Sequence, residues 1–174
     1  MSYKNMSYRN RADLGEEHSW TDAGQLIILG LFLAIWILDS FVFKFSTFLN
    51  KYIPSFINLS LAGALLVIWA YMSVTGLKTV FGTVRETPHV ITAGLFGIFR
   101  HPIYFASMVF FTGLALSTLS LISICLLFPI FLFYNHVSAF EEKKLIEKYG
   151  EEYRKFIGSN YRWVPFLRRR QART

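Results

Sequence analysis

The chain carries little charge and almost no cysteine, and both shortages limit the classes of protein to which it can belong. Only 17% of its 174 residues are charged, while 53% are hydrophobic and 18% are aromatic. This balance is too apolar for an ordinary soluble domain of the same length. Cys125 is the only cysteine, so the chain has no internal disulfide and no cysteine-based metal site. The length predicts a single domain.

Long uncharged runs predict helices that cross a membrane. No Lys, Arg, Asp or Glu occurs within residues 23–38, 52–77 or 101–140. A membrane helix needs about 20 apolar residues, so the third run is long enough for two helices with a turn near residues 117–120. The predicted fold class is all-α, an integral membrane bundle of four transmembrane helices followed by a cytoplasmic, interfacial C-terminal helical segment. The four helices are expected at 22–43, 55–77, 102–118 and 120–140.

The basic residues predict the orientation of this bundle. With four spans, sixteen of the eighteen Lys and Arg residues lie on the side of both termini, and only Lys44 and Lys51 lie on the other. Positive charge favours the cytoplasmic side, so we expect a multi-pass protein with both termini cytoplasmic. The net charge of +7 then indicates membrane lipids as partners and not nucleic acid. No feature of the sequence requires an obligate protein partner.

Two segments outside the spans have interpretable patterns. The loop 78–101 is long for a connection between packed helices and alternates apolar with polar residues, so we expect an ordered segment on the membrane surface. After the last span, apolar residues recur at helical spacing from Leu145 to Phe156, which predicts an amphipathic interfacial helix interrupted at Gly150. Asp39, near the far end of the first span, is expected to be an interfacial carboxylate beside Lys44. A polar contact inside the bundle is the alternative.

The third span has charged groups at both of its borders. Pro102 suits the first turn of a helix, so the free backbone amides of that turn, together with Arg100 and His101, form a place for an anion. The fourth helix returns antiparallel and brings Glu141 and Glu142 to the same level. Neighbouring helical residues point about 100° apart, so at most one of the two glutamates is expected to face this site squarely. The pattern predicts a site for a polar, zwitterionic molecule with some apolar bulk.

The same region resembles a family of membrane enzymes. The run VITAGLFGIFRHPIYFASMVFFTGLAL, followed by FEEKKLIEKYGEEYRKFI and WVPF, is similar to the isoprenylcysteine carboxyl methyltransferase and phospholipid N-methyltransferase group. The resemblance covers about residues 88–166. It implies an S-adenosylmethionine-dependent methyltransferase that acts on a lipid-like or small hydrophobic acceptor entering from the bilayer. Accordingly we divide the chain into a polar N-terminal segment (1–21), two membrane helices (22–77), a methyltransferase core (78–166) and a basic tail (167–174).

The resemblance also implies roles for individual residues. Phe96 stands where the family usually has a tyrosine. The cofactor-binding residues implied for S-adenosyl-L-methionine are His89, Val90, Ile91, Thr92, Phe96, Arg100, His101, Pro102, Ile103, Tyr104, Glu141 and Glu142. Their chemistry agrees with this role, because a carboxylate fits the helix start at His101, an ammonium or ribose hydroxyl fits Glu141, and a sulfonium fits an aromatic face.

The acceptor end of the site departs from the family pattern. The carboxyl methyltransferases of this group have an arginine where this chain has Val137, with Asn135 and His136 beside it, and these three are the candidate substrate residues. Without that cation we expect a prenylcysteine carboxylate to be a poor acceptor and an amine, a thiol or an uncharged lipid-like molecule to be better. Arg85 and Glu86 are the candidate catalytic residues, with Glu86 as a base for a protonated acceptor.

Three other interpretations remain open at the level of sequence. Membrane reductases of the sterol reductase type share part of the pattern and bind NADPH, but they tend to continue Arg-His-Pro with Asn-Tyr-x-Gly-Glu, which differs from the Ile103–Ser107 stretch here. A non-catalytic membrane protein could use the same fold. A metal site of His89, His101 and Glu141 has suitable residue types but no close ligand spacing, so we predict no metal.

Overall fold

The computed structural model describes residues 19–82 and 89–163, and within these ranges the chain is helical and contains no strand. The all-α prediction is confirmed. The helical elements are α1 (Ser19–Ile37), the π-helical turn η3 (Leu38–Phe43), the 3-10 turn η4 (Phe48–Lys51), α2 (Ser55–Phe81), the 3-10 turn η5 (Gly94–Gly97), α3 (Pro102–Thr118), α4 (Leu121–Tyr149) and α5 (Glu151–Ser159).

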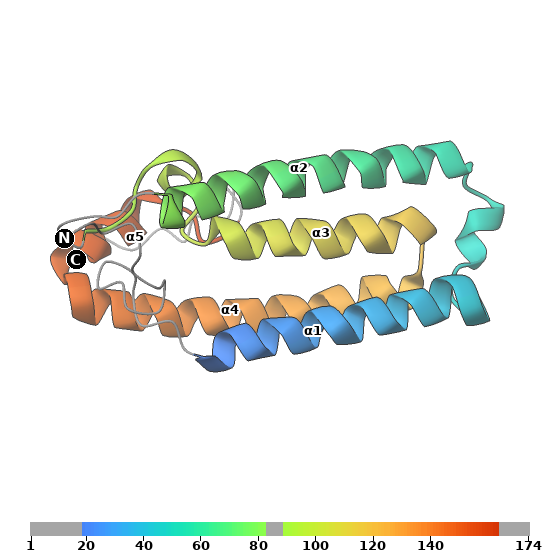
Figure 1. Ribbon diagram of the computed structural model, residues 1–174, viewed down its shortest axis with the longest axis horizontal. Coiled ribbons are helices and arrows are strands. Elements are labelled where there is room, and N and C mark those ends of the chain that lie inside the picture. Colours follow the sequence, from blue (N-terminus) through green and yellow to red (C-terminus); the bar gives the residue numbers. More distant parts are fainter. Residues whose placement is uncertain (1–18, 83–88, 164–174) are drawn as a thin grey trace, which may run out of the picture.

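The four long helices lie side by side and run alternately in opposite directions (Figure 1). Helix α2 packs along α3, and α4 packs along α1. Two glycines permit the close approach of α2 and α3: a side chain at Gly76 would meet Ile103 at 3.1 Å, and one at Gly113 would meet Leu65 at 3.4 Å. The short helix α5 folds back beside the end of α4, so the loop before α3, the end of α4 and α5 share one end of the bundle.

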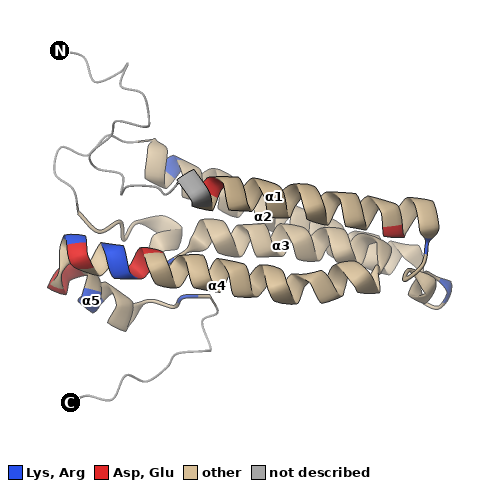
Figure 2. Cartoon of the chain, turned by 90° about the horizontal axis from the view of Figure 1, so that it is seen from below, with Lys and Arg blue, Asp and Glu red and all other residues tan. Residues whose placement is uncertain are grey.

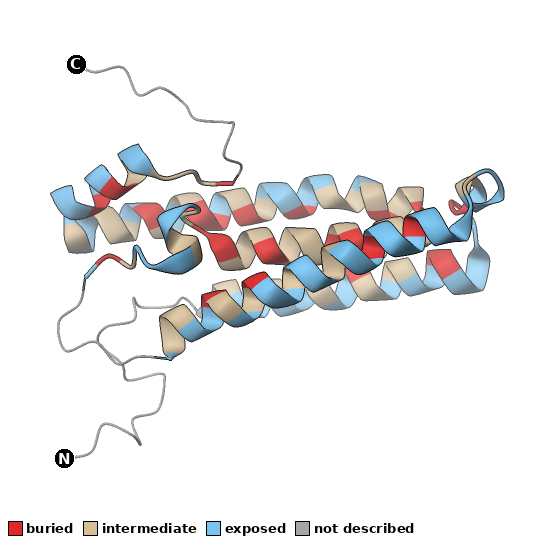
Figure 3. Ribbon diagram, turned by 90° about the horizontal axis from the view of Figure 1, so that it is seen from above, coloured by how far each residue is buried: buried red, intermediate tan, exposed pale blue. Residues whose placement is uncertain are grey.

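The interior of the bundle is small and its outer surface is apolar. Phe32, Phe111, Ile130 and Tyr134 form the buried core. The outward faces of α1 and α2 are exposed along much of their length (Figure 3), and the exposed side chains there include large hydrophobics such as Leu26. Such a surface is unfavourable in water but matches the hydrocarbon interior of a membrane.

Three helical segments in the described part of the chain are long and apolar enough to cross a membrane: Thr21–Phe43, Ser55–Phe81 and Leu121–Tyr149. Helix α3 is also apolar but has 17 residues. At 1.5 Å per residue it extends about 26 Å, which is slightly less than the hydrocarbon thickness of a typical bilayer. The prediction of four spans therefore stays a prediction for α3.

The helix boundaries follow from local backbone chemistry. Helix α3 begins at Pro102, and the turn to α4 uses Leu119 in a left-handed conformation with φ 49°. Ser120 then caps α4, because its Oγ accepts a hydrogen bond from the Ser123 amide at 3.1 Å. Helix α4 continues past the predicted span 120–140 to Tyr149, as the helical spacing after that span predicts. The predicted break at Gly150 is confirmed, since this glycine has φ 57° and separates α4 from α5.

Asp39 is buried inside the bundle, so its expected role as an interfacial carboxylate beside Lys44 is wrong. Its side chain is 4% exposed. It accepts hydrogen bonds from the Ser46 amide at 2.9 Å, from Ser46 Oγ at 2.5 Å and from Ser120 Oγ at 2.5 Å. A buried carboxylate needs such donors, and here they come from the linker after α1 and from the cap of α4. The alternative, a polar contact inside the bundle, is correct.

Candidate functional site

Charged residues gather at the end of the bundle where α3 begins and α4 ends (Figure 2). A cavity of about 830 Å³ opens there, bordered by α3, α4 and the ends of α1 and α2. The linker 89–101 before α3 contributes Phe96 to its wall. The size falls in the range of pockets for drug-sized ligands, roughly 300–1,000 Å³.

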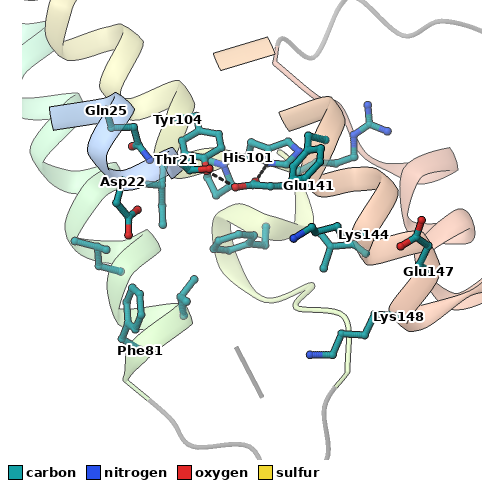
Figure 4. Close-up of a pocket in the computed structure, with 18 residues that line it drawn as sticks. Thr21, Asp22, Gln25, Phe81, His101, Tyr104, Glu141, Lys144, Glu147 and Lys148 are labelled. Atoms are coloured by element: carbon teal, nitrogen blue, oxygen red, sulfur yellow. Dashed lines mark hydrogen bonds and ion pairs between the residues drawn. The ribbon is translucent and has the colours of Figure 1, made fainter. Parts of the chain in front are cut away.

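His101 links the two glutamates of α4. This histidine is the cap residue of α3 and is 7% exposed. Its Nε2 lies 3.2 Å from Glu142 Oε1 and its Nδ1 lies 3.5 Å from Glu141 Oε2. The Tyr104 hydroxyl, one turn into α3, donates to Glu141 Oε1 (Figure 4), and the Tyr104 ring stacks on His101 with 5.7 Å between ring centroids. Glu141 is therefore held in place by two groups of α3.

Glu142 points away from the cavity and is neutralised by arginines. It is 5% exposed. Its Oε1 lies 3.2 Å from Arg100 Nε and accepts a hydrogen bond from Arg162 Nε at 3.0 Å, while Oε2 pairs with Arg162 Nη2. Only Glu141 borders the cavity, which agrees with the expectation that one of the two glutamates faces the site.

The electrostatics of this cluster favour a protonated His101. Burial lowers the pKa of the imidazole, but hydrogen bonds to Glu141 and Glu142 and the charges of both carboxylates raise it. The net result is a pKa of His101 above its ordinary value of 6.5. Protonated His101 donates from both ring nitrogens, so it can hold both carboxylates at the same time.

The segment after α5 closes the far side of the cluster. The Arg100 amide donates to the Tyr161 carbonyl at 2.8 Å, and the Tyr161 amide donates to the Ile98 carbonyl at 3.1 Å. Asn160 Nδ2 donates to the Phe96 carbonyl at 2.9 Å. These bonds attach the C-terminal segment to the linker before α3 and fix the backbone that carries Phe96 and Arg100.

The structure brings seven of the predicted cofactor residues to the cavity. Those that border it are Phe96, Arg100, His101, Pro102, Ile103, Tyr104 and Glu141. Glu142 does not border the cavity but contacts Arg100 and His101, which do. By contrast, His89, Val90, Ile91 and Thr92 do not border the cavity: Val90 packs against Tyr153 and Phe156, and its amide donates to Glu152 Oε1 at 3.1 Å.

The candidate substrate and catalytic residues lie elsewhere. Asn135 accepts hydrogen bonds from Arg162 Nη1 at 3.3 Å and from Trp163 Nε1 at 3.2 Å, on the side of α4 that faces the C-terminal segment. His136 is exposed and Val137 is buried, and none of the three borders the cavity. Arg85 and Glu86 are outside the described residues, as are the tail 167–174 and most of the predicted N-terminal segment 1–21.

Several cavity residues were not singled out from the sequence. Helix α1 contributes Thr21, Asp22 and Gln25, helix α2 contributes Leu77, Val80 and Phe81, and α4 adds Phe140, Lys144, Leu145, Glu147 and Lys148. Figure 4 shows Asp22 and Gln25 of α1 across the cavity from Lys144 of α4. Helical spacing from Glu141 would have found Lys144, Leu145 and Lys148, because residues three, four and seven positions on share its face, whereas Phe140 and Glu147 do not have this spacing. The contribution of α1 has no such local signal.

The cavity contains no evident metal site. In the two described ranges, no three His, Cys, Asp or Glu side chains are placed to hold a metal ion.

The fold and the site together define a class, an all-helical integral membrane protein with a polar, charge-paired cavity at one end of its helices. A model of the phospholipid methyltransferase family matches residues 55–152, more than half of the chain, and the protein belongs to this family of membrane methyltransferases. No curated protein and no solved structure matches the chain. The matched range contains α2, α3 and α4 but neither α1 nor Arg162.

Proposed function

We propose that this protein transfers a methyl group from S-adenosylmethionine to a lipid-like or small hydrophobic acceptor that reaches the cavity from the bilayer. The observation that carries the proposal is the cluster of His101, Tyr104 and Glu141 at the wall of an 830 Å³ cavity in a member of a methyltransferase family. When bound, S-adenosylmethionine would supply an activated methyl group on a sulfonium.

The residues of the cavity fit the parts of this donor. Glu141 is a carboxylate held by two partners, so it is ready to accept hydrogen bonds from an ammonium or from ribose hydroxyls. The first turn of α3 offers donors for a carboxylate. The rings of Phe96 and Tyr104 suit a sulfonium, with a cation–π interaction of about 0.5–2 kcal/mol. The remaining predicted cofactor residues, His89 to Thr92, stay a prediction.

The chain's own contribution to the reaction is orientation. Methyl transfer is an in-line displacement, and fixing both partners in a cavity can remove much of the barrier. Leu77, Val80 and Phe81, at the end of α2, give the cavity an apolar side suited to an acyl or prenyl chain. Because these residues end a membrane-spanning helix, we place the acceptor's entry there. An amine acceptor that arrives protonated needs a base, and Glu86 stays the candidate.

The nature of the acceptor follows from the charges at the cavity. The family arginine is replaced by Val137, which does not border the cavity, and Arg100 is paired with Glu142. We therefore propose an amine, a thiol or an uncharged lipid-like molecule as the preferred acceptor. Lys144, which borders the cavity with its Nζ 5.0 Å from the centre of the Phe140 ring, is a cation that an anionic acceptor would meet instead.

Binding of S-adenosylhomocysteine, the product of the donor, tests this function. We expect calorimetry in detergent to detect binding of S-adenosylhomocysteine and no binding of NADPH. The substitution Glu141→Gln keeps the shape of the side chain but removes its charge, and a hydrogen bond to a charged group contributes about 1.5–3 kcal/mol, so binding should weaken about tenfold or more. Glu151→Gln, an exposed carboxylate on α5, is the matched control.

The opposite result is equally informative. Heat with NADPH and none with S-adenosylhomocysteine would favour the sterol reductase type of enzyme. Heat with neither would favour a non-catalytic protein with this fold.

A further inference from the structure

Arg162, which lies outside the family-matched range, makes three hydrogen bonds to side chains of α4. Its Nε donates to Glu142 Oε1 at 3.0 Å, its Nη2 pairs with Glu142 Oε2, and its Nη1 donates to Asn135 Oδ1 at 3.3 Å. The guanidinium therefore binds both oxygens of the Glu142 carboxylate and is itself oriented by the side-chain amide of Asn135. A two-point contact of this kind fixes direction as well as charge.

Of the two arginines beside Glu142, Arg162 makes the hydrogen bonds. Arg100 Nε lies 3.2 Å from Glu142 Oε1, but this buried nitrogen has no partner in hydrogen-bonding geometry in the described structure. Arg100 Nη1 instead donates to the Ile157 carbonyl at 3.4 Å. Arg162 thus supplies the directed hydrogen bonds, while Arg100 supplies positive charge.

Glu142 in turn determines the position of the cavity residues. Its Oε1 holds Nε2 of His101, and the other nitrogen of the same ring lies against Glu141. A rotation of the Glu142 carboxylate would release the imidazole. Glu141 would then keep only its hydrogen bond from Tyr104.

We propose that Arg162 is a positioning residue of the methyl-transfer site, which holds Glu142 so that His101 and the cavity-facing Glu141 keep their arrangement. The short segment after α5 is then a required part of the enzyme, although it lies beyond the range that defines the family. This inference rests on the proposed function and adds the residue that organises its donor site.

The surroundings of Arg162 suit this role. The preceding residue, Tyr161, is bonded through its backbone to Ile98 and Arg100. The following residue, Trp163, is 9% exposed, lies against Phe131 with ring centroids 5.5 Å apart and ring planes tilted by 56°, and donates to Asn135. Arg162 lies between two anchored neighbours, so the backbone from which its side chain extends is held against the linker before α3 and against α4.

The first measurement compares three variants with the wild type for S-adenosylhomocysteine affinity, for kcat and for the donor KM. For Arg162→Gln we expect binding about tenfold or more weaker, with the loss mainly in the donor KM. Arg162→Lys keeps the positive charge but cannot make the bidentate contact with the Glu142 carboxylate, so it should recover only part of the affinity. Arg154→Gln is the control, since Arg154 lies on the exposed side of α5 and pairs with the exposed Glu151 at 3.4 Å. It should stay within about twofold of the wild type.

The second measurement separates positioning from simple stabilisation. The groups that face His101 are Glu141 and Glu142 of α4 and Tyr104 of α3, with Arg100 next to it in the chain. If Arg162 holds Glu142 against His101, its removal costs His101 the hydrogen bond and the negative charge of Glu142, which both raise the pKa of the imidazole. The pH at which donor binding declines should therefore move downward in Arg162→Gln. A residue that only stabilises the fold would lower the melting temperature and leave this pH unchanged.

The outcomes are distinct. Wild-type affinity and an unchanged pH profile in Arg162→Gln, in a protein whose wild type binds S-adenosylhomocysteine, would overturn the role of Arg162 alone. The role of Arg162 would also be overturned if Arg162→Gln and Arg162→Lys had the same affinity and if the loss of affinity followed the loss of melting temperature in both variants. A wild type that binds no S-adenosylhomocysteine would overturn the proposed function and this inference together.

Discussion

At the scale of single residues, one carboxylate faces the cavity and its neighbour is used to hold the site together. Glu141 and Glu142 are adjacent in sequence, yet their environments differ because consecutive helical side chains point about 100° apart. Glu141 borders the cavity, whereas Glu142 is buried among Arg100, His101 and Arg162. The buried glutamate contacts the histidine that both share, so the proposed donor-binding carboxylate, Glu141, would already be in place when a ligand arrives.

Lys144 is the residue whose substitution tests the predicted acceptor class. We expect the wild type to methylate amine, thiol or uncharged lipid-like acceptors better than a prenylcysteine carboxylate. The remaining activity on the carboxylate should depend on Lys144, and Lys144→Gln should reduce it about tenfold, because an interaction with a charged partner is lost. Activity on a neutral acceptor should change little. The measurement is transfer of labelled methyl groups to a panel of acceptors in liposomes.

The neighbouring Lys143 provides the control for this experiment. It is exposed and does not border the cavity. Lys143→Gln should leave the ranking of acceptors unchanged. A prenylcysteine carboxylate that proves the best acceptor of the wild type would contradict the inference drawn from Val137.

At the scale of helices, the end of the bundle opposite the cavity is joined by polar contacts around the turn between α3 and α4. The Asp39 carboxylate binds Ser46 and Ser120 there. Four further side chains from α1, η3, η4 and α2 bond to the last two residues of α3: Trp36 and Ser40 contact Thr118 Oγ1, Asn50 donates to the Thr118 carbonyl, and Asn58 donates to the Ser117 carbonyl. This arrangement fixes the α3–α4 hairpin at one end while the functional groups occupy the other.

We therefore expect Asp39 to stabilise the fold and to have no role in the proposed methyl transfer. In Asp39→Asn one carboxylate oxygen is replaced by an NH₂ group, which cannot accept a hydrogen bond from a serine hydroxyl. The free energy of unfolding should fall by about 1–2 kcal/mol. Thermal unfolding in detergent should show a lower midpoint. The affinity of the folded protein for S-adenosylhomocysteine should stay the same, because Asp39 is at the opposite end of the bundle.

The exposed Lys51, at the same end of the bundle, offers a matched control. Lys51→Gln should leave the midpoint within the error of the measurement. An unchanged midpoint in Asp39→Asn would show that the carboxylate and its serine donors contribute no net stability.

The sequence predicted the features that depend on neighbours along the chain. Pro102 starts α3, the turn near residues 117–120 leads to α4, and Gly150 separates α4 from α5, because proline, serine caps and positive-φ glycine act locally. The burial of Asp39 depends on Ser120, 81 positions away, and the contact of Arg162 with Glu142 joins residues 20 positions apart. No spacing rule reveals such pairs. The contribution of α1 to the cavity was missed for the same reason.

At the scale of the whole molecule, charge separates the two ends of the bundle. Figure 2 shows charged residues along the end of α4 and on α5, an almost uncharged middle, and few charges at the opposite end. Lys44 and Lys51 are at that opposite end, while the cavity with Lys144 and Lys148 is at the more basic end. The proposed active site should therefore face the cytoplasm, where a water-soluble donor is available, with both termini on the same side.

The presence of one cysteine makes this orientation directly measurable. Cys125 is exposed on the apolar part of α4 and can be replaced by alanine to give a cysteine-free background. Single cysteines are then introduced at Lys51, Ser117 and Lys143, and intact cells are treated with a membrane-impermeant maleimide. We expect labelling at positions 51 and 117 without permeabilisation, and at position 143 only after it. Labelling of position 117 also tests α3, because its 17 residues must cross the membrane for that turn to reach the outside.

Labelling of position 143 in intact cells would reverse the orientation and place the cavity outside. Protection of position 117 together with labelling of position 51 would mean that α3 does not span the membrane and that the four-span arrangement is wrong.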